Sequence, residues 1–284
     1  MTSTLTPTSA PRQHGGRTPV SPLRQLLRLA RTELTLFYRY RMALYIAIFP
    51  LIFAFVGITM EGEDVLPGVD TAVHYVAGTP ALVAMVVGVM HLSNVYAARR
   101  EQLVLKRFRV SGVPPVALFG ASTLSVLAVV GALTVVVGAL LAWRYGVWPA
   151  APVLVVLPVV LLTVMMAFVG IAFTRFTRNA ESAQMMSILP FMVLYAVSGL
   201  MVPLEMFPDW GADALRLLPM APAVEILQSA YLGYDLTGGV EQASQASGTE
   251  LWAAAAPSLG LLLLWLAISA YALRYFRWDP RQVS

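Results

Sequence analysis

The residues of this chain that could carry out chemistry are few and widely separated. His74 and His91 lie in apolar stretches, and the third histidine, His14, lies near the N-terminus. A membrane serine protease needs a serine nucleophile beside a histidine base, and Ser198 with His91 is the available pair. The hydropathy pattern places Ser198 at the outer end of one predicted span and His91 near the inner end of another. A bilayer would therefore separate the two side chains.

Other catalytic or energy-converting sites have even less support in the sequence. Asp209 and Asp213 resemble half of a prenyltransferase metal site, but no second acidic motif accompanies them. The chain lacks the Gly-x-x-x-x-Gly-Lys-Ser/Thr loop that binds nucleotide phosphates, and it contains no cysteine. We therefore expect no metal site, no cofactor bound by this chain and no enzymatic activity of its own.

The composition instead indicates a membrane protein. The chain is 58% apolar and 12% charged, with a mean hydropathy of +0.72, whereas soluble domains average roughly 45–50% apolar and about 25% charged residues. Six apolar runs each approach the ~20 residues that cross a bilayer. They occupy residues 42–60, 72–95, 116–142, 152–174, 182–203 and 251–273. We predict an all-α, polytopic fold with six transmembrane helices.

The charged residues predict how the chain is oriented in the membrane. If the N-terminus is cytoplasmic, 17 of the 19 Lys and Arg residues fall in cytoplasmic segments, leaving only Arg144 and Arg216 outside. Acidic residues show the opposite bias, with 11 of 15 outside. Because basic residues concentrate in cytoplasmic loops, we predict a multi-pass membrane protein with both termini in the cytoplasm.

Two segments flank the predicted spans at the N-terminal end. Residues 1–20, rich in Thr, Ser, Pro and Gly, predict a disordered tail without the apolar segment of a signal peptide. Residues 21–284 form a single predicted membrane domain. Its first segment, residues 22–41, has an apolar stripe opposite a basic face, which is typical of a helix lying in the membrane interface.

The last outer segment divides into two halves. Residues 204–236 are apolar but broken by prolines, which predicts a helical hairpin that re-enters the outer leaflet, where protein must bury its irregular backbone. Residues 237–249 consist largely of Gly, Ser, Gln and Ala and predict a flexible linker.

A strongly basic segment separates the second and third apolar runs. Residues 98–112 predict a short helix that ends before Pro114 and Pro115, with Glu101 and Phe108 on its less basic face. From these residues alone two functions remain open. The segment either touches anionic lipid or binds, as an amphipathic helix, in a groove of another protein.

The whole pattern resembles the permease subunits of ABC-2 type exporters, particularly the daunorubicin-resistance-like drug exporters. The shared order is an interfacial helix, two spans, a Glu-containing cytoplasmic helix before a proline, three spans and an outer re-entrant stretch. The most specific part is that outer stretch, which contains Ser198, Gly199, Pro203, Pro208 and Pro219. The resemblance covers about residues 22–280.

The resemblance implies that residues 98–112 are a coupling helix on a separate ATP-binding subunit. The expected contact residues are Arg100, Glu101, Val104, Leu105, Lys106, Arg107, Phe108, Arg109 and Gly112. Relatives commonly have a glycine soon after the acidic residue, where this chain has Leu103. Two ATP-binding subunits, carrying ATP and Mg, would act on two permease copies, expected to be a homodimer. Membrane lipid is the other expected partner, and nucleic acid is not one.

The resemblance also implies a substrate path along the second and fifth spans. The candidates are Met85, His91, Asn94, Met192, Tyr195 and Met201, with ordinary helix packing as the alternative for each. The implied function is efflux, and hence drug resistance or a related role: ATP-driven export of a hydrophobic or amphipathic drug, lipid or related metabolite. The alternatives are an ATP-independent channel or secondary carrier, and an intramembrane serine protease.

Overall fold

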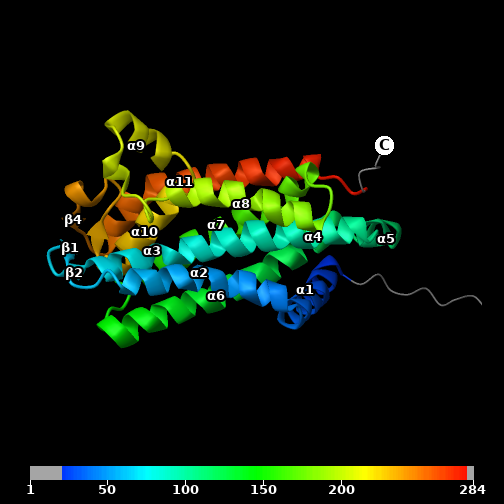
Figure 1. Cartoon of the computed structure of the whole chain (residues 1–284), viewed down its shortest axis with the longest axis horizontal. Helices are drawn as coiled ribbons and strands as arrows, with labels where there is room; N and C mark the ends of the chain where they lie inside the picture. Colours follow the sequence, from blue (N-terminus) through cyan, green and yellow to red (C-terminus); the bar gives the residue numbers. More distant parts are fainter. Residues whose placement is uncertain (1–20, 280–284) are drawn as a thin grey trace, which may run out of the picture.

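The computed structural model describes residues 21–279, so the predicted disordered tail at residues 1–20 lies outside the described part. Long helices lie side by side along one axis (Figure 1). α1 (Pro22–Arg39) and α5 (Val104–Val110) lie at one end of this bundle, and short strands with α9 (Asp209–Arg216) and α10 (Met220–Leu232) lie at the other. The charge pattern of the sequence predicts that the first end faces the cytoplasm, so we call it the inner end and the opposite one the outer end.

Five helices of the described chain are long and apolar enough to cross a membrane. They are α2 (Arg41–Ile58), the continuous helix over residues 71–101, α6 (Pro115–Tyr145), α7 (Pro152–Phe173) continued by η2 (Thr174–Phe176), and α11 (Thr249–Ala272) continued by η5 (Leu273–Tyr275). The remaining predicted span is α8 (Ala180–Ala196), a helix of 17 residues that runs along the bundle (Figure 1). The all-α, multi-pass fold is confirmed, and the count of six spans stays a prediction.

The helix over residues 71–101, called the rod below, is the centre of the bundle. It consists of α3 (Thr71–Met85), the π-helical turn η1 (Val86–His91) and α4 (Leu92–Glu101). In the most apolar 18-residue stretch of the rod, 94% of the stretch is buried inside the protein. The corresponding share for the last span, which contains α11, is 22%. The other long helices therefore enclose the rod and present their own outer faces to the surroundings.

At η1 the rod is crossed by α7 with almost no space between the two backbones. A Cβ added to Gly170 of α7 would lie 2.5 Å from the carbonyl oxygen of Gly88, and one added to Gly88 would lie 2.6 Å from the Cβ of Met166. Small residues allow membrane helices to approach this closely. The two glycines therefore fix α7 against the middle of the rod.

The outer end is a cap of short elements over the bundle. Besides α9 and α10 it contains β1 (Asp64–Leu66), β2 (Val69–Asp70), η3 (Leu204–Met206), β3 (Tyr234–Asp235), η4 (Val240–Gln242) and β4 (Ser244–Gln245). α10 is buried from Met220 to Tyr231 and packs against α3, α7 and α11. The region predicted as a re-entrant hairpin thus holds a buried helix connected by proline-rich turns.

The predicted flexible linker at residues 237–249 is instead ordered. β4 pairs with β3 in an antiparallel ladder, and the backbone N–H of Ala246 donates to the carbonyl of Gly233 at 3.0 Å. The composition predicts a flexible segment because it has few apolar side chains. The segment is ordered because its backbone forms hydrogen bonds with the residues that follow α10.

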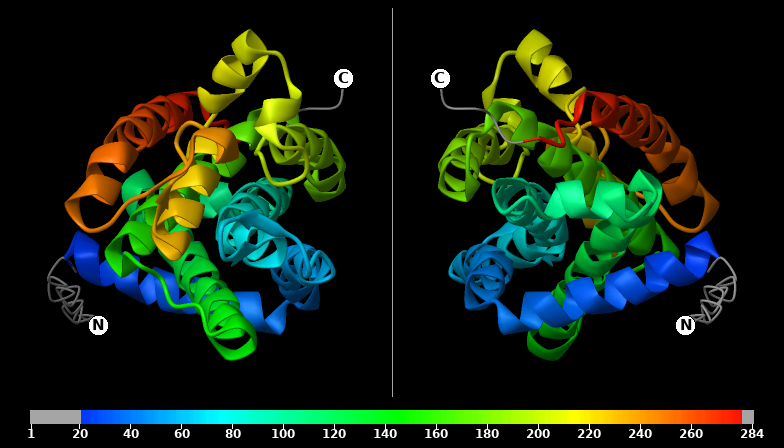
Figure 2. Two further views of the ribbon diagram at one scale, coloured as in Figure 1. Left: turned by 90° about the vertical axis from the view of Figure 1, so that its left-hand side faces the viewer. Right: turned by 90° about the vertical axis from the view of Figure 1, so that its right-hand side faces the viewer.

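At the inner end α1 lies across the bundle (Figure 2). Ser21 caps the helix by accepting from the backbone N–H of Arg24 at 3.4 Å, and Pro22 occupies its first turn. Leu26 packs against Gly120 of α6, while Arg28 and Arg31 are exposed. The helix forms where the amphipathic pattern predicts it, and its place in the membrane interface stays a prediction.

The single helix predicted over residues 98–112 is two helices in the structure. α4 continues to Glu101, the chain turns at Gln102 and Leu103, and α5 begins at Val104. Leu103 has φ 58°, a left-handed conformation that costs a non-glycine residue roughly 1–2 kcal/mol. The bend occurs because the last residues of α4 are tied to neighbouring elements, as described below, so α5 must leave in a new direction.

Replacing Gly170 with alanine is expected to destabilise the crossing of α7 and the rod. The added methyl group meets backbone atoms that cannot move aside, and overpacking of this kind costs about 1–3 kcal/mol. Thermal unfolding of the detergent-solubilised protein measures the effect. Gly131→Ala in α6 is the matched control, because no atom lies within 4 Å of its added Cβ. Equal melting temperatures for the two variants would contradict the proposed close contact.

Candidate functional site

Three consecutive residues at the inner end of the rod bind three different parts of the protein. They are Arg99, Arg100 and Glu101, the last residues of α4. Their contacts reach α1, the connection between α7 and α8, and the first turn of α8. The rod therefore does not end freely but is fixed to its neighbours immediately before α5.

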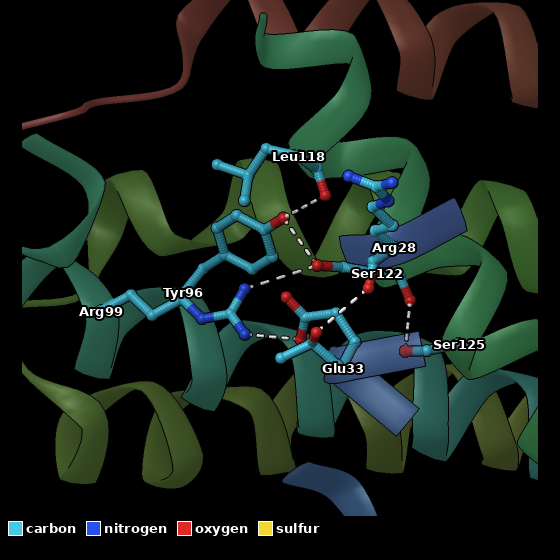
Figure 3. Close-up of polar contacts among 8 residues, drawn as sticks. Arg28, Glu33, Tyr96, Arg99, Leu118, Ser122 and Ser125 are labelled. Atoms are coloured by element: carbon cyan, nitrogen blue, oxygen red, sulfur yellow. Dashed lines mark hydrogen bonds and ion pairs between the residues drawn. The ribbon is translucent and has the colours of Figure 1, made fainter. Parts of the chain in front are cut away.

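Arg99 connects the rod to α1 and α6. Its Nη2 donates to the Glu33 carboxylate of α1 at 2.5 Å, and the two side chains are only 13% and 12% exposed. The Arg99 guanidinium also lies 5.4 Å from the centre of the Tyr96 ring. The Tyr96 hydroxyl lies 2.9 Å from Ser122 Oγ of α6 and donates to the Leu118 carbonyl at 3.3 Å. Figure 3 shows these polar groups converging between the three helices.

Arg100 is the largest fully buried side chain of the described residues, with 1% of its surface exposed. Its Nη1 donates to the carbonyl of Thr174 and its Nη2 to the carbonyl of Thr177, both at 2.6 Å. A buried cation is tolerated only when hydrogen bonds replace its hydration. Arg100 thus secures the connection between α7 and α8.

Glu101 and Asn94 hold the start of α8. The Glu101 carboxylate accepts from the backbone N–H of Ala180 at 3.5 Å, and the Asn94 amide donates to the Ala180 carbonyl at 3.1 Å. Negative charge is favourable at a helix N-terminus, where Asn179 and Ser182 also form a capping box. Any displacement of the end of the rod must therefore displace α8.

The accessible side of α5 differs from the one that the sequence predicts. Leu105 is fully buried and Phe108 packs against the core, so the less basic side of the helix faces inward. Four exposed residues line a shallow groove on this helix and are called the α5 face below: Leu103, Lys106, Arg107 and Val110. Arg100 and Leu105, both expected to contact a partner, are instead interior residues because tertiary contacts enclose them. Of the other expected residues, Arg109 and Gly112 are exposed and Val104 is half-buried.

The candidate path residues of the rod are packing residues in this conformation. Met85 is 1% exposed, and His91 and Asn94 are each 7% exposed. The His91 ring lies edge-on to Phe37 of α1, with 4.7 Å between the ring centres. These three side chains therefore fill the interior and line no open path.

The candidates from the fifth predicted span lie in three separate places. The Tyr195 hydroxyl lies 2.9 Å from that of Tyr75, inside the bundle. Met192 lines an apolar groove of about 370 Å³ between α2, η1 and α8. Met201 lines a second space, the outer cavity, among the elements of the outer cap. The structure thus does not bring the six candidates together.

The outer motif residues build turns. Ser198 Oγ donates to the Tyr195 carbonyl at 2.7 Å and accepts from the backbone N–H of Leu200 at 3.2 Å. Gly199 has φ 81°, which glycine adopts without strain. Pro203, Pro208 and Pro219 immediately precede η3, α9 and α10. Among the described residues no hydrogen bond joins Ser198 to a histidine.

Sequence reasoning missed the outer cavity. This space of about 370 Å³ lies between α3 and the outer cap, and its polar lining includes His74, Glu205, Glu225 and Glu241. These residues are far apart in the sequence. The one sequence feature that could have indicated the cavity was the excess of acidic residues in the predicted outer segments. Glu225 is 8% exposed, and burial raises its pKa to about 7 although Arg216 Nε, 3.2 Å from its carboxylate, opposes the shift.

The raised pKa of Glu225 predicts a specific pH dependence of stability. The unfolded chain releases this proton near pH 4.5, whereas the folded protein keeps it up to about pH 7. Stability is therefore lost as the pH rises through this interval. Glu225→Gln cannot ionise, so its melting temperature is expected to fall less between about pH 5 and 8 than that of the unmodified protein. The exposed Glu63 provides the control substitution Glu63→Gln, which should leave the pH profile unchanged.

Substituting Arg100 tests whether it secures the inner end. Arg100→Gln is expected to destabilise the protein strongly, because each hydrogen bond to a charged group contributes about 1.5–3 kcal/mol and two carbonyls lose their buried donor. Chemical denaturation followed by tryptophan fluorescence measures the loss. Arg109→Gln, at an exposed position on the same segment, is expected to change little. Equal stability of the two variants would rule out this role for Arg100.

Comparison with known proteins bears on the function of this arrangement. A search of curated proteins finds no match for the chain. Residues 59–273 match the family described as "ABC-2 family transporter protein", a segment that contains the rod, α5 and the whole outer cap. Members of this family are membrane transport subunits that generally work with an ATP-binding subunit. The chain belongs to the ABC-2 transporter family and is a multi-pass membrane subunit of an ABC-type transporter.

Proposed function

We propose that this chain is the permease subunit of an ABC exporter and that a separate ATP-binding subunit supplies its energy. The observation that carries the proposal is the attachment of α5 to the end of the rod. The α5 face is exposed, whereas Arg99, Arg100 and Glu101 just before it are bonded to α1, α8 and the α7–α8 connection. A force applied to α5 would therefore reach three elements of the bundle.

The α5 face defines the chemistry of the partner surface. Val110 is 83% exposed and Leu103 is 45% exposed, and both lie beside the cations Lys106 and Arg107. An amphipathic helix of this kind fits a groove with an apolar floor, and here the rim of the groove must be acidic. Arg109 is exposed but does not line the α5 face.

The assembly follows from the proposed mechanism. Two ATP-binding subunits, which hold ATP and Mg, act on two permease copies that form a homodimer. Both termini and the α5 face lie in the cytoplasm of a bacterial-type plasma membrane, and export runs from there to the outside. The apolar groove lined by Met42, Ile188 and Met192 suits a hydrophobic or amphipathic cargo such as a drug or lipid, since methionine adapts to ligands of different shapes.

Reversing the charge of the α5 face tests the proposed contact. Arg107→Glu is expected to lower the amount of ATP-binding subunit that co-purifies with the chain by about tenfold, as expected for losing about 1.4 kcal/mol of binding free energy. ATP-dependent transport into inverted vesicles should fall in parallel. The partner to use is a P-loop ATPase encoded beside this gene.

Arg109→Glu is the matched control for this experiment. It makes the same change of charge on the same helix but outside the α5 face, so complex formation should be nearly unchanged. An equal loss in both variants would show that only the net charge of the segment matters. Transport by the chain alone in liposomes under an ion gradient would instead favour an ATP-independent carrier.

A further inference from the structure

The outer cavity combines apolar walls with an excess of negative charge. Its apolar lining includes Val65, Leu200, Val224 and Leu236, and the carboxylates of Glu205, Glu225 and Glu241 belong to the same lining. A volume of about 370 Å³ falls within the roughly 300–1,000 Å³ of small-molecule sites. Apolar surface with a few convergent polar groups is also the usual composition of such sites.

The negative charge of the cavity is only partly compensated. Arg216 lies next to it, with Nε 3.2 Å from Glu225 and Nη1 3.6 Å from Asp213. Glu205 accepts a hydrogen bond from the backbone N–H of Val240 at 3.1 Å, a contact that adds no positive charge. Among the described residues, the lining therefore contains three glutamates and no Lys or Arg, with the guanidinium of Arg216 next to Glu225.

One residue of the cavity lining contains a buried polar atom without a hydrogen-bond partner in the described part of the chain. His74 belongs to the lining, and its Nδ1 has no hydrogen-bond partner among the described residues. Its backbone carbonyl accepts from the Gln228 amide at 3.1 Å, so the residue is held in place at the wall. A buried polar atom without a partner is costly to the protein.

We propose that the outer cavity binds an organic cation, a molecule with one positive charge on an apolar body, with its charge beside Glu205 and Glu225. The carboxylates of the lining repel an anion. A neutral molecule would not reduce the repulsion between these carboxylates, whereas a cation would. A bare metal ion does not fit, since no group of three potential metal ligands occurs among the described residues. That this ligand is also the transported cargo rests on the proposed function, whereas its binding does not.

A pair of probes with the same shape and opposite charge tests the proposal. The full-length chain is reconstituted in lipid nanodiscs, and equilibrium binding of tetraphenylphosphonium is compared with that of tetraphenylborate at about pH 8, above the pKa of Glu225, so that its carboxylate is charged. Glu205→Gln and Glu225→Gln keep the acceptor oxygens that bind Val240 and Arg216, so both variants should fold. Each is expected to weaken tetraphenylphosphonium binding about tenfold, the effect of losing about 1.4 kcal/mol, and the double substitution should weaken it further.

Three controls make the result decisive. Glu205→Asp keeps the charge and should retain most of the affinity, and Glu63→Gln removes an exposed carboxylate outside the cavity and should change nothing. If the double variant does not elute as a folded protein, Glu241→Gln at the exposed edge of the cavity should still lower the affinity by about threefold, or roughly 0.65 kcal/mol. Tetraphenylborate should show no loss in any variant.

The proposal is overturned if the glutamine variants bind tetraphenylphosphonium as tightly as the unmodified chain. It is equally overturned if tetraphenylborate binding depends on the same carboxylates. Because these measurements use the chain without ATP or a partner, they do not depend on coupling to an ATP-binding subunit. A cation that binds here but is not transported with ATP would leave the cavity assignment intact and count against the exporter function.

Discussion

The hydrogen bonds of the Arg100 guanidinium fix the inner end of this protein. A cation with 1% of its surface exposed must receive from the protein the interactions that water would provide, and here two carbonyls between α7 and α8 provide them. The end of α4 and the α7–α8 connection can therefore move only together. Arg99 and Glu101 extend the same constraint to α1 and α8. A partner that binds α5 thus acts on a connected set of helix ends.

The middle of the rod is less regular than its two ends. η1 is a π-helical turn, which is less regular than an α-helix and frequently occurs at functional sites. The Gly88–Gly170 crossing keeps α7 in backbone contact with that turn. The rod is thus fixed at its inner end and packed against α10 at its outer end, with the least regular hydrogen bonding between them.

The sequence predicts the long helices well because a helix that crosses the bilayer needs about 20 consecutive apolar residues. The observed ends of α2, α6, α7 and α11 lie within a few residues of the predicted ones. It fails at Arg100, since an arginine after an apolar run has the pattern of a surface residue. Its burial depends on carbonyls more than seventy positions away. Leu103 was a usable signal, because the resemblance implies a glycine there and glycine commonly occupies positions with positive φ. The outer cavity could not be predicted, since its carboxylates come from separate elements that only the fold brings together.

The charge distribution that orients the chain also determines what each end can bind. The basic residues that the charge pattern assigns to the cytoplasm include Lys106 and Arg107 of the α5 face, which favour an acidic protein surface. The predicted outer segments are rich in acidic residues and contain only two basic ones, Arg144 and Arg216. Arg144 pairs with Glu61. Arg216 is therefore the basic residue that lies beside the carboxylates of the outer cavity. Association with a charged partner is steered by the summed field of a surface rather than by one ion pair. The uneven distribution of basic and acidic residues therefore predicts the orientation of the chain. It also explains why one end favours an acidic partner and the other a cation.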